Sequence, residues 1–305
     1  MSQATPDLQK PAKRTETFHP ISGGRRFRNN LATGIFAASF ILAVIPLVAL
    51  LWTVISNGLP ALFSFEWWTS SLRGIDVNTT FDGGVGHAIY GTFVQAIIAA
   101  VFSVPIGILT GIMLVEYSDS KFARPTSYMV DILAGVPSIV AALFIFGLWI
   151  MTFGNDLSAF AVALALVLLM LPVVIRSTEE MLKLVPDELR EAAWALGIPK
   201  WKTIVSVVIP TAISGMISGI FIALARVMGE TAPVLILVGY TARYNYDLMS
   251  GNMVSLPLLI KVMRDSGSEP AYFRLWGAAL TLIIIIGLFN VLAAFASKAL
   301  APKTK

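Results

Sequence analysis

Long apolar stretches without any Asp, Glu, Lys or Arg dominate the chain. A helix needs about 20 predominantly apolar residues to cross the hydrocarbon core of a bilayer. The stretches that meet this requirement are residues 29–65, 83–115, 132–155, 157–175, 203–225 and 275–297. Residues 231–242 and 248–260 are also apolar, but each stretch is too short to cross alone. Because the turn-punctuated alternation of barrel strands is missing, the pattern predicts an all-α membrane protein with six transmembrane helices.

The positions of Lys and Arg predict how these helices are oriented. Most of the 22 Lys and Arg residues lie in the N-terminal tail, in residues 121–124 and 176–202, and in the C-terminal tail. Cytoplasmic segments of membrane proteins carry an excess of these residues, so we expect both termini in the cytoplasm. The predicted organisation is a cytoplasmic polar tail at 1–28, a first transmembrane helix with an outer loop at 29–82, a transmembrane domain at 83–297 and a cytoplasmic tail at 298–305.

The composition agrees with a membrane protein and argues against several other classes. Hydrophobic residues make up 56% of the chain and charged residues 13%, and the mean hydropathy is +0.78. A soluble domain carries about 25% charged residues, so a soluble enzyme is excluded. The chain has no cysteine and only two histidines, which predicts no metal site and no thiolate nucleophile. It also lacks the GxxxxGK[ST] phosphate-binding motif, so we expect it to bind no ATP and no other cofactor.

The segment between the fourth and fifth apolar stretches predicts a short amphipathic helix. Asp187 is a suitable N-cap, and Gly197 fits the position just after the helix, with Pro199 beyond it. The predicted apolar face consists of Leu189, Ala192, Ala193 and Leu196. Such a face should dock into a groove, either on a partner or on the bundle itself. The mixed charge of the polar face argues against a helix that lies on lipid headgroups.

Motifs in this segment resemble a known family. Glu191-Ala192-Ala193, then Gly197, then Ile209-Pro210, resembles the EAA loop of ABC importer permeases, here residues 176–208. The resemblance implies a type I ABC importer (MetI-like) permease bundle. It also implies that the short helix seats in a cleft of a separate ATPase. The residues to which it assigns this coupling role are Asp187, Glu191, Ala192, Ala193, Leu196 and Gly197.

A second set of motifs resembles the permeases of bacterial phosphate importers of the PstA-like type. These motifs are Ala225-Arg226-x-x-Gly229-Glu230-Thr231-Ala232-Pro233, Gly83-Gly84-x-Gly86, the segment from Asp131 to Val140 and the segment from Leu171 to Glu180. The resemblance implies a multi-pass protein of the bacterial inner membrane that forms half of a phosphate translocation path. The implied partners are a PstC-like second permease, two copies of an ATP-binding subunit, an extracytoplasmic phosphate-binding protein and membrane lipids, with no nucleic acid. ATP and Mg would be used by the partner ATPase.

Four charged residues are candidates for the substrate path. Arg226 and Glu230 lie between apolar stretches, where a charge is costly unless it has a function. Gly229 permits a helix break there, and broken helices line cavities in transporters. We expect Arg226 to bind phosphate and Glu230 to pair with it when the path is empty; the alternative is that both snorkel to the interface. Arg176 is either a positive-inside anchor or an inner path charge, and Asp131 is an interfacial N-cap, a partner for an arginine or a path residue.

Other functions and a packing motif complete the predictions. The residues alone leave open the import of sulfate, molybdate or phosphonate, and more distantly a membrane-embedded enzyme acting on lipid phosphates. That enzyme would need an acid/base or metal constellation, which is absent from the sequence.

Gly107-x-x-x-Gly111 and Gly215-x-x-x-Gly219 predict close helix packing, because small residues let helix backbones approach in lipid.

Overall fold

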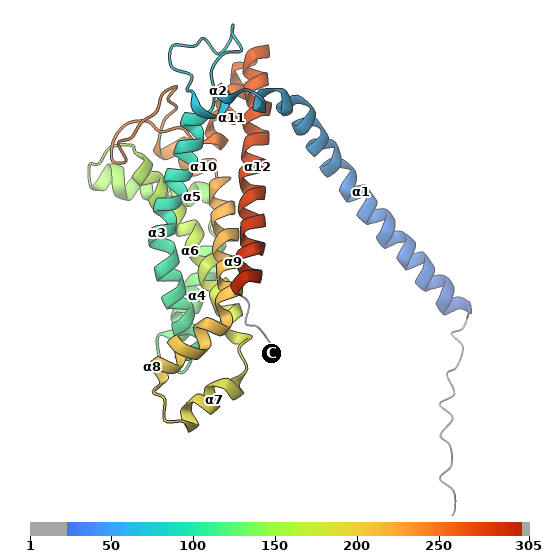
Figure 1. The fold of residues 1–305 in the computed structure, drawn as a ribbon, viewed down its shortest axis with the longest axis vertical. Coiled ribbons are helices and arrows are strands. Elements are labelled where there is room, and N and C mark those ends of the chain that lie inside the picture. The colour runs from blue at the N-terminus through green and yellow to red at the C-terminus, as the bar shows by residue number, and fades with distance from the viewer. Residues whose placement is uncertain (1–22, 301–305) are drawn as a thin grey trace, which may run out of the picture. The chain divides into compact units, whose positions relative to one another are not determined.

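The computed structural model describes residues 23–300, and within this range it consists of helices and connecting segments without strands (Figure 1). The helices are α1 (Gly23–Leu62), α2 (Phe65–Thr69), α3 (Gly86–Glu116), α4 (Ala123–Ala134), α5 (Ser138–Ile145), α6 (Ala159–Lys183), α7 (Asp187–Ala195), α8 (Lys200–Thr203), α9 (Ile209–Met228), α10 (Ala232–Leu237), α11 (Leu256–Ser266) and α12 (Glu269–Leu300), with two π-helical segments, η1 (Phe146–Thr152) and η2 (Ile204–Val208). The chain divides into two units between Trp52 and Thr53, within α1.

The first unit, in its described part, is the N-terminal portion of α1. Its most apolar window has a mean hydropathy of 2.6, and none of that window is buried. A helix that is apolar on all sides is typical of a membrane span. The helix starts at Gly23, so it includes residues 23–28 of the predicted polar tail; residues 1–22 lie outside the described range.

The second unit is a bundle around α6. Helices α3 and α9 both pack against α6, and α12 packs against α9 (Figure 1). In its most apolar window α6 is 61% buried, whereas α3, α9 and α12 are each 28% buried. The sequence explains this position, because α6 has a run of alanine, leucine and valine with no charge before Arg176. The central helix therefore touches the packing faces of both neighbours.

Both predicted glycine motifs pack against α6. A Cβ atom added to Gly111 of α3 would lie 2.7 Å from the Thr178 side chain. A Cβ atom added to Gly219 of α9 would lie 1.6 Å from Oγ of Ser177. The prediction of close packing is thus confirmed, and it places two helix backbones directly against one central helix.

The predicted third span is bent. The stretch 132–155 does not form one continuous helix, because α4 ends at Ala134 and α5 begins at Ser138 with an angle of 104° between the two segments. Pro137 is the cause: it disfavours helical geometry at the preceding residue, so the chain leaves the helix there. The described chain has five continuous helices able to cross a membrane, or up to six if the bent pair is one span.

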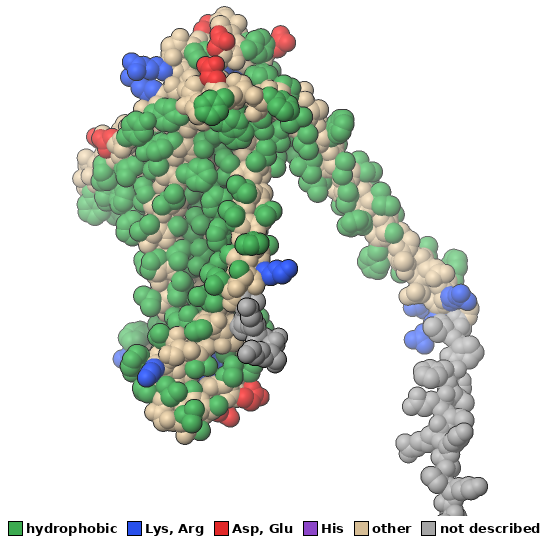
Figure 2. Space-filling view, viewed as in Figure 1, with side chains coloured by type: hydrophobic (Ala, Val, Ile, Leu, Met, Phe, Trp, Pro, Cys, Tyr) green, Lys and Arg blue, Asp and Glu red, His purple; other side chains and the backbone are tan. Residues whose placement is uncertain are grey.

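The surface of the second unit supports membrane insertion. Figure 2 shows apolar side chains over the middle of the bundle, with charged side chains gathered toward its two ends. Exposed large side chains of this belt include Val101, Leu109 and Leu288. One end carries α7 and α8 and is called the α7 end below; the other carries α2 and α11 and is called the opposite end. Which end faces the cytoplasm stays a prediction.

Buried polar side chains attach the segment before α3 to α12 at the opposite end. The indole Nε1 of Trp67 donates to Oγ1 of Thr281 at 3.0 Å. The Arg274 guanidinium is fully buried and donates to the carbonyl oxygens of Val77, Thr80 and Asp82. These bonds give the buried Arg274 guanidinium acceptors from the loop, so the predicted outer loop is an ordered part of the bundle.

Candidate functional site: the α7 junction and the α9–α10 break

The predicted coupling helix is present as α7, within a segment that is largely helical. Helix α6 continues to Lys183, so only residues 184–186 and 196–199 of the predicted EAA loop are non-helical connections. The N-cap is Pro186, and Asp187 is the first helical residue, which corrects the predicted cap by one position. Asp187 and Glu188 still stabilise the first turn, because carboxylates interact favourably with a helix N-terminus.

The end of α7 has the predicted glycine cap. Gly197 has φ of +75°, the left-handed region that favours glycine. Its N–H donates to the carbonyl of Trp194 at 2.8 Å, and Ile198 N–H donates to the carbonyl of Ala193 at 3.1 Å. These two bonds form a Schellman motif, so Gly197 ends the helix and turns the chain toward α8.

Apolar side chains form part of the exposed side of α7, next to exposed carboxylates. Leu189 is 41% exposed, Trp194 48% and Leu196 80%. Ala193 is buried, so the predicted apolar face is split: Ala193 lies against the bundle, while Leu189 and Leu196 point outward. The structure thus leaves a small apolar surface uncovered on the helix that the sequence motif assigns to coupling; Glu191 and Ala192 are exposed beside it.

The buried side of α7 carries Arg190, which the sequence pattern places on the polar face. Arg190 is only 8% exposed. Its Nε and Nη2 atoms donate to Oε1 of Glu116, at 3.1 and 3.0 Å. Its Nη1 atom donates to the carbonyl of Val185 at 2.7 Å and to Oδ1 of Asp187, and Nη2 also donates to the carbonyl of Leu182 at 3.0 Å. All five guanidinium donors therefore have acceptors, from α3, from the end of α6 and from α7 itself.

Arg176 and Asp131, two of the predicted path residues, are in direct contact. An ion pair joins Nη2 of Arg176 in α6 to Oδ1 of Asp131 in α4. Arg176 also donates to Oγ of Ser127 at 3.0 Å and pairs with Glu179, which in turn pairs with Lys183 at 2.7 Å. Asp131 lies inside α4, so among the predicted alternatives it is a partner of an arginine and not an N-cap.

The other two predicted path residues lie at the break between α9 and α10. Arg226 is exposed in the last turn of α9, and Glu230 is half-buried in the connection. Helix α9 ends at Met228, so the two residues do not share a helix. Within residues 23–300 no ion pair includes either side chain. The expected Arg226–Glu230 pair is therefore not formed in this structure.

A groove lined by apolar residues and by two cationic side chains lies next to this break, between α10 and α11. It has a volume of about 420 Å³ and is lined by Thr231, Leu235, Ile260, Lys261 and Arg264, among others. Lys261 and Arg264 both pair with Asp265, at 2.6 and 3.4 Å. The hydrogen bond from Lys261 holds the pKa of Asp265 below its usual range. The two cations make the groove electropositive, although Asp265 offsets part of their charge.

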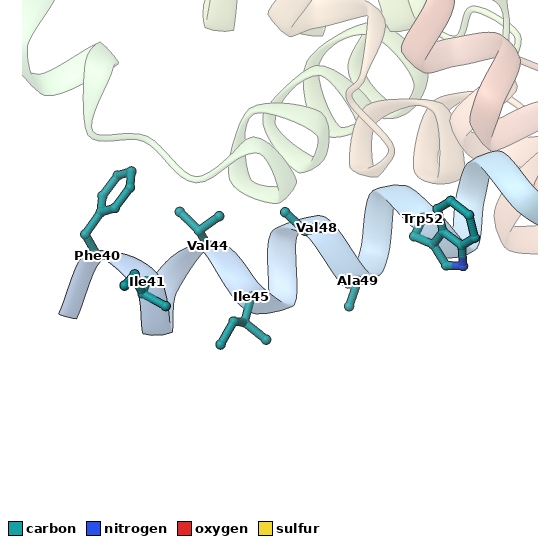
Figure 3. A pocket seen from close by; sticks show the side chains of 7 residues that line it. All are labelled: Phe40, Ile41, Val44, Ile45, Val48, Ala49 and Trp52. Atoms are coloured by element: carbon teal, nitrogen blue, oxygen red, sulfur yellow. The ribbon is translucent and has the colours of Figure 1, made fainter. Parts of the chain in front are cut away.

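A second hollow lies along the first unit and is unsuited to an anion. Figure 3 shows it lined by side chains of α1 alone, from Phe40 to Trp52. No charged residue lines it. Groups of three or more His, Asp or Glu that could hold a metal ion are also absent from residues 23–300.

The contacts that Arg190 and Lys200 make with the ends of α3 and α6 are called the α7 junction. The sequence did not reveal these contacts. The sequence pattern places Glu116 at the polar end of a span and Arg190 on the polar surface of an amphipathic helix. Their contact joins positions 74 residues apart, which helix periodicity does not report. One signal was present: Glu116 directly follows an apolar stretch, where a carboxylate favours a partner.

Comparison with known proteins agrees with this architecture. Residues 103–305 match the family described as binding-protein-dependent transport system inner membrane component. The chain is 57% identical over 287 residues to the phosphate transport system permease protein PstA of Mycobacterium leprae (strain TN). The aligned residues cover 94% of this chain and 94% of that protein. The chain belongs to this family, among the PstA permeases. It is 34% identical to the PstA protein of Yersinia pestis, over 95% of this chain and 96% of that protein.

Solved structures show the same fold. The chain superposes on an inward-facing methionine ABC transporter, MetNI, with a TM-score of 0.56 and 19% identity, over 72% of this chain and 94% of that chain. A bacterial ABC transporter involved in alginate import gives a TM-score of 0.54 and 13% identity, over 88% and 99%. The predicted type I importer permease bundle is confirmed. Family membership makes the chain a multi-pass transporter subunit, which removes the membrane-enzyme alternative.

Proposed function

We propose that the chain is one of the two permease subunits of an ATP-driven importer of inorganic phosphate. The observation that supports phosphate as the substrate is the 57% identity, over nearly the whole chain, to proteins named as phosphate transport permeases. Binding of a solute-loaded protein outside and ATP turnover inside would drive alternating access, without a covalent step in this chain. The proposed partners are a second, PstC-like permease, an extracytoplasmic phosphate-binding protein and two ATPase subunits, which use the ATP and Mg.

The proposed coupling element is α7. Its outward side presents Leu189, Trp194 and Leu196. Exposure of this apolar surface to water is unfavourable, which is typical of a protein interaction site. A helix of this kind fits an apolar groove on a partner, with the neighbouring Glu191 at its rim. In this assignment the α7 end, together with both termini, faces the cytoplasm, as the distribution of Lys and Arg predicts.

The proposed substrate path runs past the α9–α10 break. Arg226 lies there without an ion-pair partner among the described residues, so its guanidinium is free to give two parallel hydrogen bonds to a phosphate. Glu230 is close in sequence and can accept the hydrogen of a phosphate hydroxyl, which sulfate lacks at neutral pH. Arg176 and Asp131 are proposed as path charges nearer the α7 end, where they already pair with each other.

The test is uptake by the reconstituted complex. Proteoliposomes containing both permeases and the ATPase should take up labelled phosphate when the binding protein is added outside and ATP is inside. Unlabelled phosphate should compete, whereas sulfate, molybdate and phosphonate should not at the same concentration. Uptake of one of those anions in preference to phosphate would reassign the substrate. Concentrative uptake by this chain alone would contradict the whole assignment.

A further inference from the structure

The contacts of Arg190 and Lys200 join the α7 segment to the end of α3 at two points. Arg190, within α7, donates two hydrogen bonds to the Glu116 carboxylate at the last position of α3. Lys200, at the start of α8, donates to the carbonyl oxygen of the same residue. The Lys200 ammonium also lies 4.4 Å from the centroid of the Tyr117 ring. One residue within α7 and one residue after it are therefore tied to two consecutive residues at the end of α3.

Apart from the three-residue connection at 184–186, little else holds α7 on the side of α3 and α6. Arg190 and Ala193 are the only buried residues of α7, and the helices it packs against most closely are α8 and η2. The long Arg190 side chain reaches past this packing to the end of α6, where it satisfies the carbonyls of Leu182 and Val185. The Leu182 carbonyl lies in the last turn of α6 and the Val185 carbonyl lies just after it, where carbonyl oxygens no longer take part in regular helix hydrogen bonds.

We infer that the Glu116–Arg190 ion pair is the link through which displacement of α7 moves α3 and α6, with both residues acting as positioning residues. The inference rests on the proposed function, because it assigns a role within coupling to an ATPase. The guanidinium is planar and all of its donors are engaged, so α7 cannot rotate relative to α3 without breaking several directional bonds at once.

The rest of the bundle is arranged to carry this displacement further. Helix α3 touches α6 through Gly107 and Gly111, and α6 touches α9 through Gly215 and Gly219. Helices in such close contact move together, because only the α6 side chains lie between the backbones and the packing leaves them little space to yield. Movement of α3 and α6 therefore reaches α9 and the break that carries Arg226.

The experiment measures phosphate transported per ATP hydrolysed in the reconstituted complex. The decisive variant is Glu116→Gln, which keeps the size of the side chain and removes its charge. Asp119→Asn is the matched control, because Asp119 is exposed in the connection just after α3. Glu116→Asp, which keeps the carboxylate, and Arg190→Lys, which keeps the charge but not the five donors, complete the set. Values are compared at equal amounts of assembled complex.

We expect Glu116→Gln to lower transported phosphate per ATP by about fivefold or more, which is the lower range of coupling between distant sites. Glu116→Asp should retain more coupling than Glu116→Gln, and Asp119→Asn should match the unmodified chain. If Glu116→Gln lowered the yield of assembled complex but left the phosphate transported per ATP unchanged, the ion pair would have only a structural role. That result would overturn this inference and leave the proposed function intact. A complex of unmodified subunits without ATP-dependent phosphate uptake would overturn the proposed function and this inference together.

Discussion

Arg190 and Arg226 are both arginines in helices, yet their surroundings are opposite. Arg190 is 8% exposed, and all of its donors are bound to acceptors of this chain. Arg226 is exposed at a helix break and has no ion-pair partner among residues 23–300. A guanidinium whose donors are all engaged can hold helices together but can bind nothing further. One whose donors are free can bind an anion, so the partners of each arginine distinguish a structural link from a candidate ligand site.

The largest expected effect is on stability, at the α7 junction. Arg190→Ala leaves the Glu116 carboxylate buried without a counter-charge, which should lower the free energy of unfolding by about 3–5 kcal/mol. The measurement is thermal unfolding of the purified chain in detergent, followed by size-exclusion chromatography. Arg243→Ala removes an exposed arginine and should leave the unfolding temperature unchanged. Equal stability of the two variants would show that the Arg190 contacts contribute little.

The next effect is on transport, at the α9–α10 break. Arg226→Gln removes charge-assisted hydrogen bonds to phosphate, each worth about 1.5–3 kcal/mol, so uptake should fall by about tenfold or more. The unfolding temperature should not change, because Arg226 has no ion-pair partner in the described chain. Initial uptake rates in proteoliposomes provide the measurement, with Arg243→Gln as the matched control. Normal uptake by Arg226→Gln would remove this residue from the path.

A smaller effect is expected where α9 meets the centre of the bundle. Gly219→Ala places a Cβ atom 1.6 Å from Oγ of Ser177, so α9 and α6 must separate, at a cost of about 1–3 kcal/mol. The control is Gly287→Ala in α12, where an added Cβ meets no atom within 4 Å. The double variant Gly219→Ala with Ser177→Gly should recover most of the lost unfolding temperature. Failure to recover would mean that the contact is not the source of the loss.

The smallest effect concerns the ion pair between Arg176 and Asp131. The Asp131 side chain is 62% exposed, so Asp131→Asn should cost no more than about 1 kcal/mol in the free energy of unfolding. The same chromatographic assay applies, and Asp156→Asn gives a charge-matched comparison. A loss as large as that of Arg190→Ala would contradict the expectation that an exposed pair contributes little to stability.

Much of the fold followed from hydropathy and from local motifs. Uncharged stretches long enough to cross a bilayer located the five long helices, because burial of apolar surface in lipid depends on composition and length. Gly197 and Pro199 located the end of α7, because a left-handed residue without a Cβ ends a helix at little cost. The bend near Pro137 was missed, since an uncharged stretch does not reveal where its axis turns.

The candidate sites were harder to foresee. Arg226 and Glu230 stood out as charges among apolar residues, but their separation by a helix end depends on where α9 stops. Arg176 and Asp131 stood out individually, and only the crossing of α4 and α6 brings them into contact. The coupling and path roles of these residues stay predictions until the complex is assayed.

The sequence by itself determined that the chain enters a membrane, that its helices pack through glycines and that a short capped helix follows the fourth apolar stretch. These properties depend on hydropathy, residue size and backbone preference, all of which are local. Only the tertiary structure decided that Arg190 is buried, that it binds Glu116 and that Leu189 and Leu196 point outward. Those facts depend on which helices meet, and contacts between residues far apart in the sequence leave no periodic trace along the chain.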